Sequence, residues 1–366
     1  MKSLLILTAG FGEGHNAAAR NLREAISVKS PQTNVLVSDV FLDAYGQLIR
    51  LAEKGYLAVI NGLPNLWQKA FDALDRTRVV ERHICVLGAA ARRLERLIAE
   101  RRPSVVISTY PGCNHLLDFI YRKRLKRPFR MVTVITDSLT INSVWFRAHS
   151  DFFLVANEAT ANVLIKAGIP EQKIRVFGFP VPRIFASLDG LRPMPSPDGR
   201  WRILYVINSG RGMAPEIVRR LLETNDVDLT VTTRRDEDLA CRIRAVSAGA
   251  GKTLNLLGWT ADMPRLMAES HLLISKAGGA TVQESLAAKT PMIITQIVPG
   301  QEEGNARLIL ESKAGALATT PEQISATARG AFADGASEWI KWQRAASSLS
   351  RPSAADDIAE FLLGFA

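Results

Sequence analysis

Glycine-rich loops with polar neighbours recur at four points in the sequence, each directly after a short apolar run typical of a buried strand. The first follows residues 4–7, opens a helical pattern, and contains Gly12, Gly14 and His15. Glycine lets a ligand approach the backbone closely, and the start of a helix favours negative charge. His15 is therefore a candidate for orienting or deprotonating a hydroxyl group. The alternative is a histidine that caps the helix or packs in the core.

An anion site is predicted where a later strand pattern meets its helix. Backbone N–H groups of Gly279, Ala280 and Thr281 at that helix start would face an anion such as a diphosphate. Glu284, about one helical turn further on, is a candidate for binding the two hydroxyls of a ribose. A simple turn explains the pair Gly278 and Gly279, but it gives no reason for the acid.

A polar cluster follows the next strand pattern, at residues 292–295. Gln301, Glu302 and Asn305 carry side chains that suit the hydroxyl groups of a sugar. Polar residues are common in loops, so the cluster alone is weak evidence for a sugar site. Its position in the sequence, shortly after the predicted anion site, is the main support for this prediction.

Another glycine loop follows the strand pattern at residues 203–207. Asn208, Gly210 and Arg211 are candidates for contacting a phosphate or a leaving group. The alternative is a tight strand-to-helix turn without a ligand.

One carboxylate stands at the end of the strand pattern at residues 131–135. This position suits Asp137 as a general base, because ligands of open α/β sheets bind at the carboxyl ends of strands. Asn142 and Trp145 follow it closely and are candidates for the acceptor side. The alternative is an aspartate that caps a helix or a turn.

The elements that must position these residues alternate between strand and helix patterns, which predicts doubly wound parallel sheets. The pattern restarts after the proline-rich residues 183–200, so we expect an α/β protein with two Rossmann-like domains facing across a cleft. Residues 1–185 form the predicted acceptor and membrane-facing domain, and residues 186–330 the donor-binding domain. Residues 331–366 read as helices that pack back towards the first domain.

Composition limits the class of protein. The chain has 366 residues, of which 47% are hydrophobic and 22% charged, and this excludes disordered, collagen-like and coiled-coil classes. Its three cysteines are far apart, which is typical of a reducing compartment. The apolar run at residues 4–7 is too short for a secretory signal, and no run reaches the length of a membrane span. We expect a cytoplasmic protein that associates peripherally with the membrane.

Charge is distributed unevenly along the chain. Residues 1–185 carry 26 Lys and Arg against 15 Asp and Glu, whereas residues 186–366 carry 20 against 21. Such asymmetry suggests an anionic membrane or a nucleic acid as partner. The basic clusters lack aromatic interleaving and any nucleic-acid motif, so no nucleic acid is expected. Residues 56–74 have an apolar helical face that includes Trp67 and Phe71. This face is a candidate membrane anchor and acceptor platform. The alternative is that the face packs on the sheet.

No metal site is expected. The D-x-D string at Asp236 and Asp238 resembles a metal-binding motif of some sugar-nucleotide enzymes, but it reads as the charged start of a helix. Histidine and cysteine spacings typical of metal ligands are missing from the sequence, as is a Walker A string.

The strings Gly278-Gly279-x-Thr281-x-x-Glu284 and Pro299-Gly300-Gln301-Glu302-x-x-Asn305 resemble the donor half of a known glycosyltransferase family. It includes monogalactosyldiacylglycerol synthase, processive diacylglycerol glucosyltransferase and the peptidoglycan lipid II synthase. The first loop, Leu7-Thr8-Ala9-x-x-Gly12-x-Gly14-His15, is more similar to the diacylglycerol branch.

This resemblance implies a GT-B fold and an inverting, metal-independent transfer from UDP-glucose or UDP-galactose to diacylglycerol, without a cofactor. Uracil would lie near Trp259 and Thr260. Ribose would bind Glu284, and the hexose would bind Gln301 and Glu302. The acceptor would lie near His15 and Asp137, either of which is a candidate base.

The sequence departs from the family at Asn142, where a histidine is frequent, and at Ala277 and Tyr110. Three alternatives remain open. The protein is a transferase that acts on another lipid acceptor, a UDP-GlcNAc 2-epimerase, or a basic membrane- or RNA-binding module.

Overall fold

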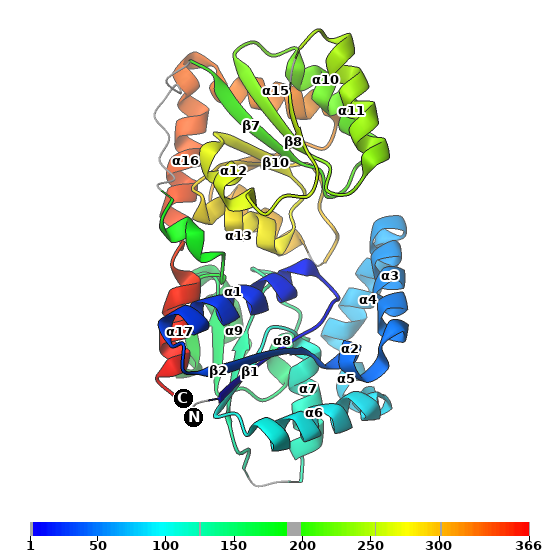
Figure 1. Ribbon diagram of the computed structural model, residues 1–366, viewed down its shortest axis with the longest axis vertical. Coiled ribbons are helices and arrows are strands. Elements are labelled where there is room, and N and C mark those ends of the chain that lie inside the picture. The colour runs from blue at the N-terminus through cyan, green and yellow to red at the C-terminus, as the bar shows by residue number, and fades with distance from the viewer. Residues whose placement is uncertain (1–2, 124–125, 189–198, 253, 301, 366) are drawn as a thin grey trace. The chain divides into compact units, whose positions relative to one another are not determined.

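Two compact units make up the chain in the computed structural model, which describes residues 3–123, 126–188, 199–252, 254–300 and 302–365 (Figure 1). The first unit comprises Met1–Arg183, Val298–Gly304 and Ser353–Ala366, and the second comprises Ile184–Ile297 and Asn305–Pro352. Of the predicted linker at residues 183–200, residues 189–198 lie outside the described residues.

A six-stranded parallel sheet, in the order β2-β1-β3-β4-β5-β6, forms the centre of the first unit. Its strands are β1 (Ser3–Thr8), β2 (Asn34–Asp39), β3 (Val105–Ser108), β4 (Arg130–Val134), β5 (Phe152–Val155) and β6 (Ile174–Val176). Their continuous aliphatic runs are typical of strands that are covered on both faces.

Alternate residues of β1 and β3 pack into two separate cores. Leu4 and Ile6 contact α1 (Glu13–Lys29) and α17 (Ala354–Leu363) on one face. Leu5 and Leu7 face the opposite core, with α2 (Val40–Tyr45), α6 (Gly88–Arg101) and α7 (Pro111–Tyr121). Helices therefore cover both faces of the sheet. The edge at which its parallel strands have their carboxyl ends is left for a binding site.

A helical insertion separates β2 from β3. It consists of α3 (Gln47–Gly62), α4 (Pro64–Arg76), α5 (Val79–His83) and the 3-10 helix η1 (Ile84–Leu87). The remaining helical elements of this unit are α8 (Val144–Arg147), α9 (Glu158–Lys166), η2 (Glu171–Lys173) and the first residue of η3 (Arg183–Ala186).

The second unit also contains a six-stranded parallel sheet, in the order β12-β11-β10-β7-β8-β9. Its strands are β7 (Trp201–Val206), β8 (Val227–Thr232), β9 (Asn255–Leu257), β10 (Leu272–Ser275), β11 (Met292–Ile294) and β12 (Gly315–Leu317). The helices α10 (Ala214–Leu222), α11 (Glu237–Gly249), α15 (Pro321–Phe332) and α16 (Ser337–Leu349) share one core with it. The others are α12 (Met263–Glu269), α13 (Gly279–Ala287), η4 (Asp334–Ala336), the rest of η3, and α14 (Glu303–Glu311) apart from its first two residues.

The predicted α/β class with two doubly wound sheets is confirmed. The helix start at Asp236 is also confirmed, because its carboxylate accepts the N–H of Leu239. Ser353 and Asp356 have the spacing of a capping box, but Ser353 makes no side-chain cap bond and Asp356 accepts a 2.7 Å hydrogen bond from Arg183. Among the described residues, no helix combines the length and apolarity needed to cross a bilayer.

Candidate active site

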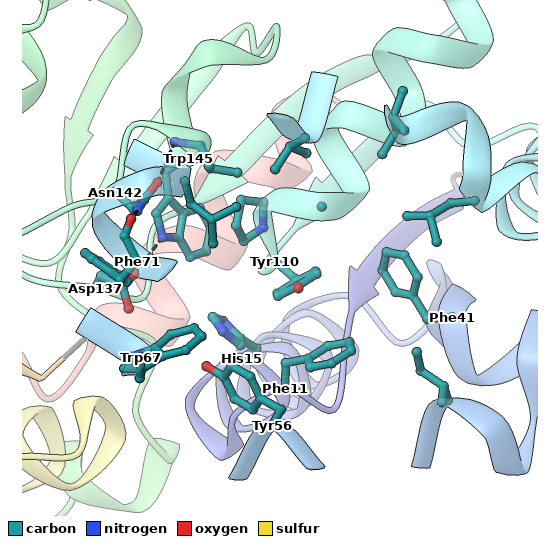
Figure 2. Close-up of a pocket in the computed structure, with 18 residues that line it drawn as sticks. Phe11, His15, Phe41, Tyr56, Trp67, Phe71, Tyr110, Asp137, Asn142 and Trp145 are labelled. Carbon is teal, nitrogen blue, oxygen red and sulfur yellow. Dashed lines mark hydrogen bonds between the residues drawn. The ribbon is translucent and has the colours of Figure 1, made fainter. Parts of the chain in front are cut away.

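A cavity of about 340 Å³ opens in the first unit where β1, β3 and β4 end (Figure 2). The segments after these adjacent strands supply Phe11, Tyr110 and Asp137, and the helical insertion supplies most of the opposite wall. The lining residues are Phe11, His15, Phe41, Ile49, Tyr56, Trp67, Phe71, Leu74, Val80, Ile84, Leu87, Tyr110, Pro111, Gly112, Asp137, Asn142, Val144 and Trp145. Nearly all are apolar or aromatic, so the cavity suits a hydrophobic ligand.

Polar side chains gather at one end of this cavity. The indole N–H of Trp145 donates a 2.7 Å hydrogen bond to Oδ2 of Asp137. Asn142 is buried, and its side-chain amide donates to the backbone carbonyl of Phe71 at 3.0 Å. The structure thus places Asp137, Asn142 and Trp145, three candidates from the sequence, in the wall of one cavity.

Burial weakens the acidity of Asp137. Desolvation raises the pKa of its carboxyl group to about 6, and the hydrogen bond from Trp145 opposes this shift only in part. The group is still ionised at neutral pH. A carboxylate whose pKa lies near the working pH is well matched to general-base chemistry.

His15 lies in the first turn of α1 and lines the same cavity as Asp137 and Trp145. Its Nδ1 is 2.9 Å from the hydroxyl of Thr136, and its ring lies 5.8 Å from that of Trp145. Burial lowers the pKa of His15 to about 4, despite a hydrogen bond to the backbone of Thr109. The imidazole is therefore neutral at pH 7 and a weaker base than Asp137. Gly12 is the N-cap residue of α1 and Gly14 lies in its first turn.

Trp67 and Phe71 project from α4 into the cavity (Figure 2). The ring of Trp67 packs edge-on against Tyr56 of α3 at 5.0 Å. On the outer surface of the same insertion, Leu63 and Leu66 are each 55% exposed. The apolar pattern of residues 56–74 therefore divides into side chains that line the cavity and side chains that face solvent.

The carboxyl end of α4 is fixed to the loop that follows Asp137. The backbone N–H of Ser143 donates to the Asp75 carboxylate at 2.6 Å, and the Ser143 hydroxyl donates to the carbonyl of Asp75. Arg147 also donates to the carbonyl of Leu74 at 2.8 Å. These bonds fix the position of α4, which carries Phe71, relative to the segment that carries Asn142 and Trp145.

The segment Val298–Gly304 packs against this same loop. A Cβ on Gly304 would lie 1.7 Å from the carbonyl oxygen of Ser138, so only glycine fits there. Glu302 is buried, and its carboxylate accepts the N–H of Val298 at 3.0 Å. Gln301, predicted to bind the sugar, lies outside the described residues.

The predicted donor residues of the second unit follow the carboxyl ends of its parallel strands. Asn208 comes after β7 and lies 3.5 Å from the hydroxyl of Ser275, the last residue of β10. Gly210 has a φ of +67°, which suits the tight turn that the sequence left as the alternative to a ligand contact. Arg211 forms a 3.1 Å ion pair with Asp236 and stays 65% exposed, so its guanidinium remains accessible to an anion.

The amino terminus of α13 follows β10 directly. Gly278 is its N-cap residue, and Gly279, Ala280 and Thr281 form its first turn, whose N–H groups have no helical acceptors. Glu284 lies further along the same helix. The predicted strand–loop–helix geometry is therefore present, and anion binding at this helix start stays a prediction.

Three further predicted residues flank this edge of the second sheet. Trp259 follows β9 and is 64% exposed, and the hydroxyl of Thr260 accepts the N–H of Asp262 at 3.0 Å. Asn305, at the start of α14, is buried and donates to the carbonyl of Ala277 at 3.2 Å. It thereby fixes the turn that precedes Gly278.

Several cavity residues were not among the predicted site residues. Tyr110 contacts Phe11, His15 and Phe41, and Tyr56 contacts Phe11 and Trp67. The available signal was the placement of the aromatic residues Phe11 and Tyr110 directly after buried strands. No group of three or more potential metal ligands occurs in the part of the chain that the structure describes.

Solved structures with the same fold are glycosyltransferases and sugar-nucleotide epimerases. MurG of Acinetobacter baumannii matches with a TM-score of 0.66 and 14% identity, over 100% of both chains. The UDP-GlcNAc 2-epimerase of Neisseria meningitidis bound to UDP-GlcNAc matches with a TM-score of 0.60 and 14% identity, also over 100% of both chains. The fold is therefore GT-B.

The family models that match the chain are those of glycosyltransferases. Residues 15–181 match the monogalactosyldiacylglycerol (MGDG) synthase family, and residues 213–318 match the glycosyltransferase family 28 C-terminal domain. The chain is 27% identical to monogalactosyldiacylglycerol synthase 2 of Arabidopsis thaliana, over 98% of this chain and 80% of the relative. It is 24% identical to the processive diacylglycerol beta-glucosyltransferase of Bacillus subtilis, over 91% and 87%. The protein is a glycosyltransferase whose residues 15–181 are similar to MGDG synthases and whose residues 213–318 are similar to the family 28 C-terminal domain.

Proposed function

We propose that the protein transfers a hexose from UDP-glucose or UDP-galactose to the free hydroxyl of diacylglycerol, with inversion at the anomeric carbon. The observation that carries this proposal is the apolar cavity whose polar end holds Asp137, His15 and Asn142. A lipid with one reactive hydroxyl matches such a cavity. The names of the relatives, a galactolipid synthase and a diacylglycerol glucosyltransferase, support the same acceptor.

Asp137 is the proposed general base. Its carboxylate accepts the proton of the acceptor hydroxyl while that oxygen attacks the anomeric carbon of the hexose. The bond between this carbon and the diphosphate breaks on the opposite face, UDP departs, and a β-glycoside forms. Trp145 orients the carboxylate through its N–H, and neutral His15 is suited to hydrogen-bond the acceptor hydroxyl rather than to take its proton.

The departing diphosphate is stabilised by the amino terminus of α13. Free N–H groups of Gly279, Ala280 and Thr281 would hydrogen-bond its oxygens. Arg211, which follows the neighbouring strand β7, would supply positive charge. These groups act in place of a metal ion, and the reaction is proposed to need no cofactor. Glu284 would bind the ribose, and Glu302 with Gln301 the hexose. Trp259 and Thr260 would flank the uracil.

The acceptor dissolves in a bilayer, so the protein must reach a membrane surface. Leu48, Leu51, Leu63 and Leu66 are between 55% and 73% exposed on α3 and α4, the helices whose inner faces line the cavity. Basic side chains of the first unit attract anionic lipids. A peripheral position on the cytoplasmic face of a membrane is therefore part of the proposal.

The test incubates purified protein with each UDP-hexose and with diacylglycerol in anionic vesicles, with EDTA present. Release of UDP together with a β-linked glycolipid is the expected result, and strict dependence on added Mg²⁺ would exclude the metal-free mechanism. Parallel incubation with UDP-GlcNAc alone tests epimerisation. Parallel polyprenyl and carotenoid acceptors test the other lipid classes.

A further inference from the structure

Two rows of touching side chains run along the cavity from its polar end. On the sheet side, Asp137 bonds to Trp145, whose ring lies 5.8 Å from that of His15. The His15 ring in turn lies 5.2 Å from Tyr110, and the Tyr110 ring lies 5.8 Å from Phe41. Asp137 and Phe41 are thus separated by three intervening rings, and Figure 2 shows them at opposite sides of the cavity.

The second row lies on the helical insertion and the first loop. Phe71 contacts Trp67 at 6.2 Å, and Trp67 contacts Tyr56 at 5.0 Å. Tyr56 lies 5.6 Å from Phe11, which stacks on Tyr110 at 5.8 Å. Both rows therefore begin near Asp137 and converge at Tyr110. The cavity is elongated, with one polar end and two aromatic walls.

Core side chains line the cavity around Phe41. Phe41 is 4% exposed and Ile84 is 7% exposed, and both belong to the core that α6 and α7 form on the sheet. Leu87 of η1 also lines the cavity and packs against the same core. The wall at Gly112 is also tight, because a Cβ there would lie 2.7 Å from the Tyr110 ring. A ligand that enters at the polar end meets packed core at the other.

We propose that this cavity holds one acyl chain of the acceptor lipid and that Phe41, Ile84 and Leu87 set the longest chain that fits. The proposal rests on the proposed function, because the chain must lie with its glycerol hydroxyl at Asp137. The indole N–H of Trp67 is buried and donates no hydrogen bond to any residue that the structure describes. An ester carbonyl next to the glycerol is a suitable acceptor for it.

Chain length then controls binding through simple hydrophobic burial. Each methylene that enters the cavity strengthens binding about fourfold, until the chain end reaches the far wall. Beyond that length the added carbons stay outside or force the wall to move, and the gain stops. The dependence of binding on acyl length therefore has a maximum or a plateau whose position the far-end residues determine.

The experiment measures kcat/KM for diacylglycerols that differ only in acyl length, from octanoyl to oleoyl. Leu87→Phe fills the far end, and the optimum should move to shorter chains, with at least a tenfold loss for the longest one. Phe41→Leu enlarges that end and should move the optimum to longer chains. Val86→Phe is the matched control, because Val86 lies next to Leu87 but is 76% exposed, and its profile should equal that of the wild type.

Binding of the same lipids is also measured by quenching of tryptophan fluorescence, since Trp67 and Trp145 line the cavity. Folding of each variant is checked by its melting temperature. If Leu87→Phe and Phe41→Leu fold and leave the length profile unchanged in both assays, the acyl-chain assignment is wrong. If the wild type binds the lipids with the expected length profile but glycosylates none, the proposed function is wrong and the assignment stands.

Discussion

Burial shifts the protonation equilibria of Asp137 and His15 in opposite directions, and this distinguishes two residues that the sequence left as equal candidates. Desolvation penalises the charged form of each group, so the pKa of the acid rises to about 6 and that of the imidazole falls to about 4. At neutral pH the stronger base is the carboxylate of Asp137.

The pH dependence of kcat/KM tests this assignment. The base must be ionised, so activity should be lost as the pH falls through about 6, the pKa of Asp137. Asp137→Asn should lower kcat by about 10²–10⁴-fold and remove this acid limb. A limb near pH 4 that persists in Asp137→Asn and disappears in His15→Gln would instead identify His15 as the base.

Trp145 offers a second test at the residue scale. Its N–H stabilises the charged form of Asp137, so Trp145→Phe should raise the pKa of Asp137 further. The acid limb of the activity profile should move to higher pH, with kcat recovering at alkaline pH. Loss of activity without movement of the limb would mean that Trp145 serves only to pack the cavity.

At the scale of elements, α3 and α4 present two different apolar surfaces. The sequence predicted one amphipathic face for residues 56–74, because the 3- and 4-residue spacing of its apolar positions fits a single stripe. It could not show that Trp67 and Phe71 turn to the cavity while Leu63 and Leu66 face solvent, because that division depends on how α4 packs beside α3 and on the bonds between Asp75 and Ser143.

Membrane binding is expected to depend on the outer surface. The double variant Leu63→Ser and Leu66→Ser should reduce binding to anionic vesicles several-fold, because it removes apolar area that would enter the bilayer. The melting temperature should stay nearly unchanged. Val28→Ser is the matched control, since Val28 is similarly exposed, at 54%, but lies on α1. Equal loss of vesicle binding in both proteins would contradict the assigned surface.

The packing of Val298–Gly304 on the loop after Asp137 is another element-scale feature. Gly304→Ala introduces a Cβ that must displace the Ser138 backbone, an overpacking that costs about 1–3 kcal/mol. Activity should fall at least tenfold, because the packing between the segment that carries Glu302 and the loop after Asp137 is disturbed. Gly330→Ala is the control, as nothing lies within 4 Å of the added Cβ in α15. Full activity in Gly304→Ala would show that this contact is not needed for transfer.

For the whole molecule, the alternation of strands and helices was sufficient to predict two doubly wound sheets, because short aliphatic runs separated by amphipathic helices have few other solutions. The placement of the candidate donor residues was also predictable, since Asn208, Trp259 and Gly278 each come shortly after a strand of the second sheet. Their role in donor binding stays a prediction. The cavity was not, because its walls combine Phe11, Tyr56 and Tyr110 from segments far apart in the chain, and only the folded sheet brings them together.

Electrostatics is also a property of the whole chain. Residues 1–185 contain 11 more basic than acidic residues, whereas residues 186–366 are nearly balanced. Vesicle binding should therefore weaken as salt rises, because exposed charges are screened within about 8 Å at physiological ionic strength. Sedimentation with vesicles of increasing anionic content, at low and high salt, measures this. Binding that is indifferent to both variables would remove the electrostatic part of the proposal.

The central claim, hexose transfer to diacylglycerol at the cavity of the first unit, is tested most directly by mass spectrometry of the lipids of cells that express this chain. The wild type should produce a hexosyl-diacylglycerol that is missing from cells with an empty vector and from cells that express Asp137→Asn at the same level. Unchanged diacylglycerol lipids, or an equal yield of glycolipid from the wild type and Asp137→Asn, would contradict the account.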